Sequence, residues 1–68
     1  MKIKRAAVKV INPDSGSICW LSGFLDADHK VPLFSHSPIF FPVRFALDYS
    51  VLLRHLYPLV KVVPGYEY

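Results

Sequence analysis

Residues 2–11 alternate between apolar and polar positions in the manner of a β-strand with one buried face. Ala6, Val8 and Val10 lie on one side of this strand, and basic residues share the other side. Residues 12–17 (Asn-Pro-Asp-Ser-Gly-Ser) then combine the residues that favour tight turns. Because a second β-prone run follows at once, the pattern predicts a hairpin.

The second run, residues 18–25, is apolar on both faces, which is typical of a strand that is covered on both sides or carries a surface patch. Gly23 interrupts it and indicates a bulge or a closely approaching backbone. We expect the two faces to divide as follows: Ile18, Trp20 and Phe24 towards the core, and Cys19, Leu21 and Leu25 away from it.

Residues 45–57 change to the period of an amphipathic helix. The apolar stripe consists of Phe45, Tyr49, Leu52, Leu53 and Leu56, and we expect it to cover the sheet. The opposite face carries Arg44, Asp48, Ser50, Arg54 and His55. Pro58 ends the helix, residues 59–63 read as a further strand, and Pro64 and Gly65 are expected to break that strand.

Three prolines prevent a long regular element in residues 31–43. The pattern allows a short strand at residues 31–34 and another extended piece at residues 39–43. Pro42 is acceptable in the first turn of a helix, and Asp48 is an alternative N-cap. We therefore expect the helix to start between Pro42 and Asp48.

Together these elements predict one α+β domain over residues 1–68, in the order strand, strand, helix, strand. Its sheet would be mainly antiparallel, with three or four strands and the helix packed on one face. The second sheet face has no obvious cover. Three alternatives would cover it: a folded-over proline-rich segment, a second subunit or a binding partner.

Composition makes the apolar surface the main clue to function. The chain is 53% hydrophobic and 15% aromatic, with a formal charge of +3. Only about 60% of the unfolded surface is buried in a domain this small, so some apolar side chains must lie on the surface or in an interface. No stretch is long enough to span a membrane, and the N-terminus lacks the apolar core of a signal peptide. The single Cys19 fits a cytoplasmic setting.

Catalysis finds little support in the sequence. His29, His36 and His55 share no metal-ligand spacing, and Cys19 has no neighbouring base. Residues 26–29 (Asp-Ala-Asp-His) lack the features of a calcium loop and read as a solvated turn. We therefore expect a chain that is not an enzyme and that uses no cofactor or metal.

Protein binding is the activity that the sequence favours. The aromatic and basic residues that we expect to contact a partner are Phe40, Phe41, Arg44, Arg54, Tyr66 and Tyr68. An alternative is a nucleic-acid-binding module, in which the basic residues of the first strand bind the ligand: Lys2, Lys4, Arg5 and Lys9. A third hypothesis is a homo-oligomer that joins its apolar sheet faces. No contact with a membrane is expected.

The end of the chain resembles small strand-strand-helix-strand proteins of phages and other mobile elements. The resemblance covers the helix at residues 48–56 (Asp-Tyr-Ser-Val-Leu-Leu-Arg-His-Leu) and the following strand at residues 60–63 (Val-Lys-Val-Val). It implies a non-catalytic protein that binds and inhibits a host protein, such as an enzyme or a defence complex. It identifies no site residues, since a shared layout does not fix a function.

Overall fold

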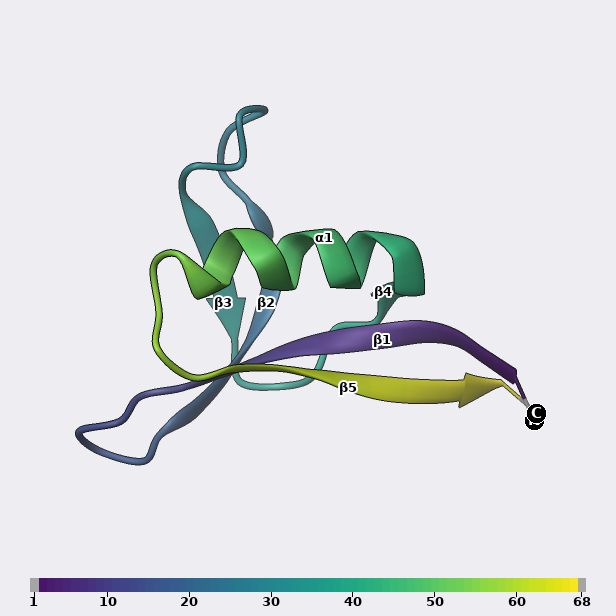
Figure 1. Ribbon diagram of the computed structural model, residues 1–68, viewed down its shortest axis with the longest axis horizontal. Coiled ribbons are helices and arrows are strands. Elements are labelled where there is room, and N and C mark those ends of the chain that lie inside the picture. The colour runs from purple at the N-terminus through teal and green to yellow at the C-terminus, as the bar shows by residue number, and fades with distance from the viewer. Residues whose placement is uncertain (1, 68) are drawn as a thin grey trace.

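A computed structural model describes the backbone of residues 2–67 and the side chains of residues 5–65. It contains five strands and one helix (Figure 1). The elements are β1 (Lys2–Ile11), β2 (Ile18–Phe24), β3 (Pro32–Ser35), β4 (Phe41–Pro42), α1 (Val43–Arg54) and β5 (Val60–Glu67).

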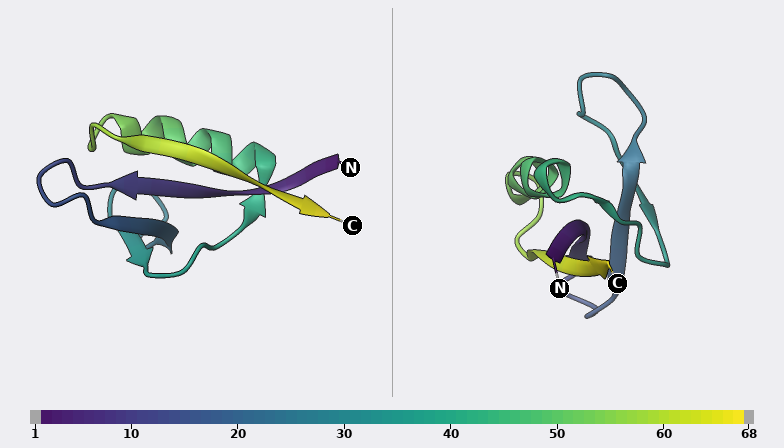
Figure 2. Two further views of the ribbon diagram at one scale, coloured as in Figure 1. Left: turned by 90° about the horizontal axis from the view of Figure 1, so that it is seen from below. Right: turned by 90° about the vertical axis from the view of Figure 1, so that its right-hand side faces the viewer.

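β1 is the centre of the sheet. It pairs with β2 near its end, with β4 near Arg5 and with β5 along most of its length, and all of these pairs are antiparallel. β3 adds to the outer side of β2. The sheet curls into a half-barrel, and α1 lies in the angle between β1 and β5 on one side and β2 and β3 on the other (Figure 2).

The expected α+β class is therefore confirmed, with an antiparallel sheet and one helix packed on it. The sheet has five strands rather than three or four because both short extended pieces of the proline-rich region form strands, β3 and β4. The helix was expected to reach Tyr57, but it ends at Arg54 and a turn follows, in which the Leu56 and Tyr57 N–H groups donate to the Leu53 carbonyl. It starts at Val43, inside the expected interval, with Pro42 at its N-cap. Pro42 lacks only an N–H that the helix would not have used.

The predicted hairpin loop is also confirmed. The Asp14 N–H donates to the side-chain oxygen of Asn12 at 2.9 Å, and the Gly16 N–H donates to the Asn12 carbonyl at 2.8 Å. Gly16 has a φ of 75°, in the left-handed region that glycine adopts without steric cost. These local bonds fix which residues of β1 and β2 stand opposite each other.

The pairing of β1 with β2 corrects the expected faces of β2. Val10 stands opposite Cys19, and Lys9 stands opposite Trp20. Because directly paired residues share a face, Cys19 and Leu21 lie on the helix side, while Trp20 lies on the other.

The register of β2 against β3 shifts between Leu21 and Gly23, as the glycine predicted. A bulge resets the alternation of side chains along a strand. Leu21 and Phe24 therefore both pack into the core, although they are three positions apart. The face expected for Phe24 is right, and that expected for Leu21 is wrong.

The side of α1 that packs on the sheet also differs from the one that the sequence predicted. Ala46, Ser50 and Leu53 are at most 2% exposed, and they form the buried stripe. Ser50, expected on the polar face, is buried at little cost because its hydroxyl donates to the Leu47 carbonyl at 2.7 Å. Of the expected stripe, only Leu53 is fully buried.

The small side chains allow this orientation. The sheet side of the core under α1 is built from Ala6, Val8 and Val10, which project little from β1. With Ala46 and Ser50 facing them, the helix backbone can approach β1 closely. Phe45 or Leu52 in the same place would hold the helix away from the strand, because protein interiors are close-packed.

β5 extends further than the sequence indicated. Pro64 and Gly65 were expected to end it, but they pair with Ala6 and Arg5, and the strand continues to Glu67. β5 pairs only with β1, so it is an edge strand, where a proline is tolerated when its nitrogen faces away from the ladder.

The proline-rich segment covers part of the second sheet face. It is one of the three alternatives that the sequence offered for covering this face. A Cβ added to Gly65 would lie 2.8 Å from the Phe40 ring, so that ring packs directly on the glycine. Ala7, on the same side of β1 as Arg5 and Lys9, is fully buried.

Two neighbouring leucines test the orientation of α1. We expect Leu53→Ala to lower the free energy of unfolding by about 3 kcal/mol, since it leaves a cavity in the core. Leu52→Ala removes a solvent-exposed side chain and should cost less than about 1 kcal/mol. Urea unfolding followed by circular dichroism measures both. Equal losses for the two variants would contradict the observed orientation.

Candidate functional site

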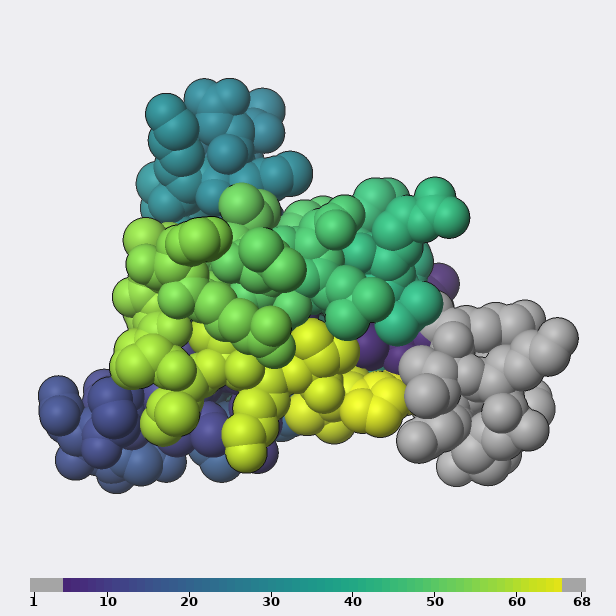
Figure 3. Space-filling view, viewed as in Figure 1, coloured from purple at the N-terminus to yellow at the C-terminus, as the bar shows by residue number. Residues whose placement is uncertain are grey.

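Three large apolar side chains form a stripe along one flank of α1 and the turn that follows it, which we call the helix patch: Phe45 and Leu52 of α1, and Leu56 of the turn after Arg54. They are 49%, 40% and 59% exposed. The spacing of seven residues places Phe45 and Leu52 on the same side of α1, about 10 Å apart along its axis. Leu56 follows in the closing turn, where its N–H donates to the Leu53 carbonyl. Figure 3 shows the outer side of α1 open to solvent, below the projecting loop between β2 and β3.

An aromatic cluster supports the patch from below. The Tyr49 ring lies between α1 and the sheet, with ring centroids 5.1 Å from Phe24 and 5.3 Å from Phe41. Phe45 stacks on Tyr49 at 6.3 Å with an interplanar angle of 17°. Ring pairs of this kind add about 0.5–1.5 kcal/mol beyond area burial, so Phe45 is held in place although it is exposed.

The patch was absent from the sequence-predicted site because its members were assigned to the core. The sequence holds two competing stripes, one of large residues and one through Ala46, Ser50 and Leu53. Hydrophobicity alone favours the first. The signal for the second is the set of small residues facing the small side chains of β1.

The structure separates the predicted aromatic anchors. Phe40 is exposed and lies over Gly65, on the sheet face away from α1. Phe41 pairs with Ala6 and is half-buried beside Tyr49, on the helix side. The two neighbours point to opposite faces because they are consecutive in an extended segment.

The basic residues of the predicted sites are also dispersed. Arg44 and Arg54 are exposed at the two ends of α1. Arg5 and Lys9 lie on the face of β1 away from the helix. The side chains of Lys2, Lys4 and Tyr66 and the whole of Tyr68 lie outside the part that the structure describes.

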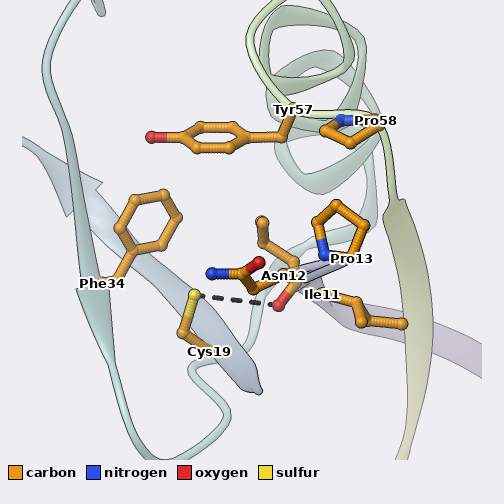
Figure 4. A pocket seen from close by; sticks show the side chains of 8 residues that line it. Ile11, Asn12, Pro13, Cys19, Phe34, Tyr57 and Pro58 are labelled. Atoms are coloured by element: carbon orange, nitrogen blue, oxygen red, sulfur yellow. Dashed lines mark hydrogen bonds between the residues drawn. The ribbon is translucent and has the colours of Figure 1, made fainter. Parts of the chain in front are cut away.

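A hollow of about 260 Å³ lies beneath the end of α1. Tyr57 forms one wall and Phe34 another, with Cys19 and Asn12 at the opposite side (Figure 4). The remaining lining residues are Val10, Ile11, Pro13 and Pro58. The ring centroids of Phe34 and Tyr57 are 5.6 Å apart in an edge-to-face arrangement. With walls that are mainly apolar and no charged side chain, the hollow suits an uncharged apolar group.

The Cys19 thiol lies in this hollow and donates a weak hydrogen bond to the Val10 carbonyl, with sulfur and oxygen 3.7 Å apart. Burial raises the pKa of the Cys19 thiol above its ordinary value, because the thiolate is poorly solvated there. A raised pKa keeps the group in its unreactive thiol form near neutral pH.

No group of three or more His, Cys, Asp or Glu side chains in the described part of the chain is arranged to hold a metal ion. The helix of the described residues is too short and too polar to cross a bilayer. Comparison of the chain with family models, with curated proteins and with solved structures finds no match in any of the three.

The thiol gives a pH-dependent prediction. Alkylation of Cys19 by iodoacetamide at pH 8 should be several-fold slower in the folded protein than in urea, because fewer molecules carry the thiolate. Because the folded state binds the thiol proton more tightly than the unfolded state, Cys19 makes its full contribution to stability below the thiol pKa of the unfolded chain. That contribution is lost as pH rises through the pKa of the folded state. Mass spectrometry over time measures the rate. A folded rate equal to or above the unfolded rate would contradict the burial of Cys19.

Proposed function

We propose that this chain is a non-catalytic protein-binding module that inhibits or regulates its partner by covering a surface of it. The observation that carries the proposal is the orientation of α1. The helix turns Ala46 and Ser50 inward and leaves Phe45 and Leu52 exposed, and Leu56 is exposed in the turn that follows. A contiguous exposed apolar stripe is unfavourable in water and marks interaction sites in soluble proteins.

The patch has the properties of a binding hot spot. Phe45 and Leu52 lie on α1, and Phe45 is pre-oriented by stacking on Tyr49, so little of its side-chain entropy is lost on binding. Arg44 and Arg54 stand near the ends of the same helix, where they can assist encounter with an acidic partner surface. The hollow beneath Tyr57 lies beside the last residue of the patch and offers a recess for one apolar side chain of the partner.

The resemblance in layout to small proteins of phages and mobile elements directs the proposal towards an inhibitor of a host enzyme or defence complex. In this mechanism the chain supplies no reacting group; it excludes substrate or a second subunit from the surface that it covers. Its unreactive thiol is compatible with work in the reducing cytoplasm, where we place the protein.

Substitution of the patch tests this proposal. The immobilised chain first captures its partner from host lysate, and the affinity of the purified pair is then measured by titration calorimetry. The variant Phe45→Ala/Leu52→Ala/Leu56→Ala should bind at least about a hundredfold more weakly, since it removes three apolar anchors. Any enzyme activity of the partner should fall in proportion to the amount of chain bound and recover with this variant.

A matched control removes exposed apolar side chains elsewhere. Leu25 and Val31 are exposed in the projecting loop between β2 and β3, so Leu25→Ala/Val31→Ala should leave the affinity within about twofold. Full affinity in the patch variant would overturn the assignment of the site. Sedimentation equilibrium adds a second check, because a dimer of the chain that the patch variant abolishes would make the patch a contact between copies instead.

A further inference from the structure

Two lysines and the single tryptophan form a row across the sheet, on the face away from α1. Lys9 in β1 stands directly opposite Lys61 in β5 on one side and Trp20 in β2 on the other. Directly paired residues share a face, and neighbouring strands are about 4.8 Å apart. Lys61 is exposed, and Lys9 and Trp20 are partly exposed.

The row concentrates positive charge. Lysines placed directly opposite each other on neighbouring strands repel, so the Lys9–Lys61 pair is unfavourable for the folded chain alone. Arg5 adds a third positive charge on the same side of β1. Residues 5–11, 18–24 and 60–65, which build this face, contain no Asp or Glu that would offset it.

Protection of a sheet edge does not account for Lys9. Lysines commonly guard edge strands against pairing with other chains. β1, however, is the central strand, and near Lys9 it has β2 on one side and β5 on the other. A lysine here has no edge to protect, so its charge is available for a ligand.

Aromatic rings lie beside the charges at two points. Trp20 is adjacent to Lys9 in the row. Phe40 packs over Gly65, which pairs with Arg5, and its ring is partly exposed on the same face. Lys9 and Arg5 are about 13 Å apart along β1. Cations that contact phosphates beside flat rings that stack on bases are the features by which sheets bind single-stranded nucleic acid.

We infer that this sheet face, which we call the basic face (Arg5, Lys9, Trp20, Phe40 and Lys61), binds a short single-stranded segment of DNA or RNA. Lys9 and Lys61 contact backbone phosphates, and Trp20 stacks on a base. A duplex fits less well, because its bases are already stacked on one another and offer no free face to Trp20. The basic face lies on the opposite side of the sheet from the helix patch, so either site can exist without the other.

Trp20 is the only tryptophan, so its fluorescence reports on the basic face directly. Titration with an oligothymidylate about 12 nucleotides long in low salt should quench the emission in a saturable way. The logarithm of the binding constant should fall linearly with the logarithm of the salt concentration, by about 0.7 for each phosphate contacted. Lys9→Gln and Lys61→Gln should each weaken binding and reduce that slope by about 0.7.

Two controls separate this site from general attraction of a basic protein to polyanions. Lys30 is exposed in the loop between β2 and β3, so Lys30→Gln removes the same charge away from the basic face and should leave the slope unchanged. Trp20→Leu should weaken binding of a labelled oligonucleotide about tenfold, as measured by fluorescence anisotropy, whereas Trp20→Phe should retain most of it. A cooperative urea transition shows that each variant is folded; if Lys9→Gln is not, the exposed Lys61 carries the test.

Three results would overturn the inference. The first is the absence of saturable quenching by the oligonucleotide in low salt. The second is an equal loss of affinity in Lys30→Gln and Lys61→Gln. The third is binding of inorganic polyphosphate or of a duplex as tightly as the single strand, because neither offers an unstacked base to Trp20. Loss of partner binding through the helix patch would leave all three measurements unaffected.

Discussion

The close approach of α1 to β1 determines what the rest of the chain can bury. Ala6 and Val8 on the strand face Ala46 and Ser50 on the helix, and these small side chains leave a narrow layer between the two backbones. Leu21 and Leu53 are the largest fully buried side chains of the same core. Once the layer is filled, larger residues of the helix have no place inside, and they remain on its outer side.

This constraint explains why so apolar a chain has so small a core. The aromatic residues Phe24, Phe41, Tyr49 and Tyr57 gather at the margins of the layer, half-buried, where they close its ends. Tyr49 also supports the exposed Phe45, and Tyr57 forms a wall of the hollow beneath the helix. The same side chains therefore contribute to stability and shape the surfaces available to a partner.

Local patterns were sufficient to predict most elements of the fold. The alternation in residues 2–11, the turn residues after Asn12, the bulge at Gly23 and the start of the helix all depend on neighbours in sequence. The sides that the elements present to one another depend instead on residues that are far apart in sequence. The face of Trp20 follows from its register against Lys9, and the buried side of α1 follows from the small residues of a distant strand.

The same distinction applies to the candidate sites. Phe40 and Phe41 are neighbours that look like one aromatic anchor, yet an extended backbone places them on opposite faces of the sheet. Lys61 and Lys9 are far apart in sequence and stand side by side. Composition indicates that apolar and basic surface exists, and only the pairing of strands shows where it gathers.

The long pairing of β1 with β5 has a consequence for how the protein folds during synthesis. β1 has its longest partner in β5, which follows the helix and the other strands in the sequence, with matched residues from Lys2 and Glu67 to Val10 and Val60. Contacts between such distant segments form slowly, because a long loop must close first. Until β5 emerges from the ribosome, one side of the central strand is unpaired, so the nascent chain exposes backbone groups that can pair with other chains.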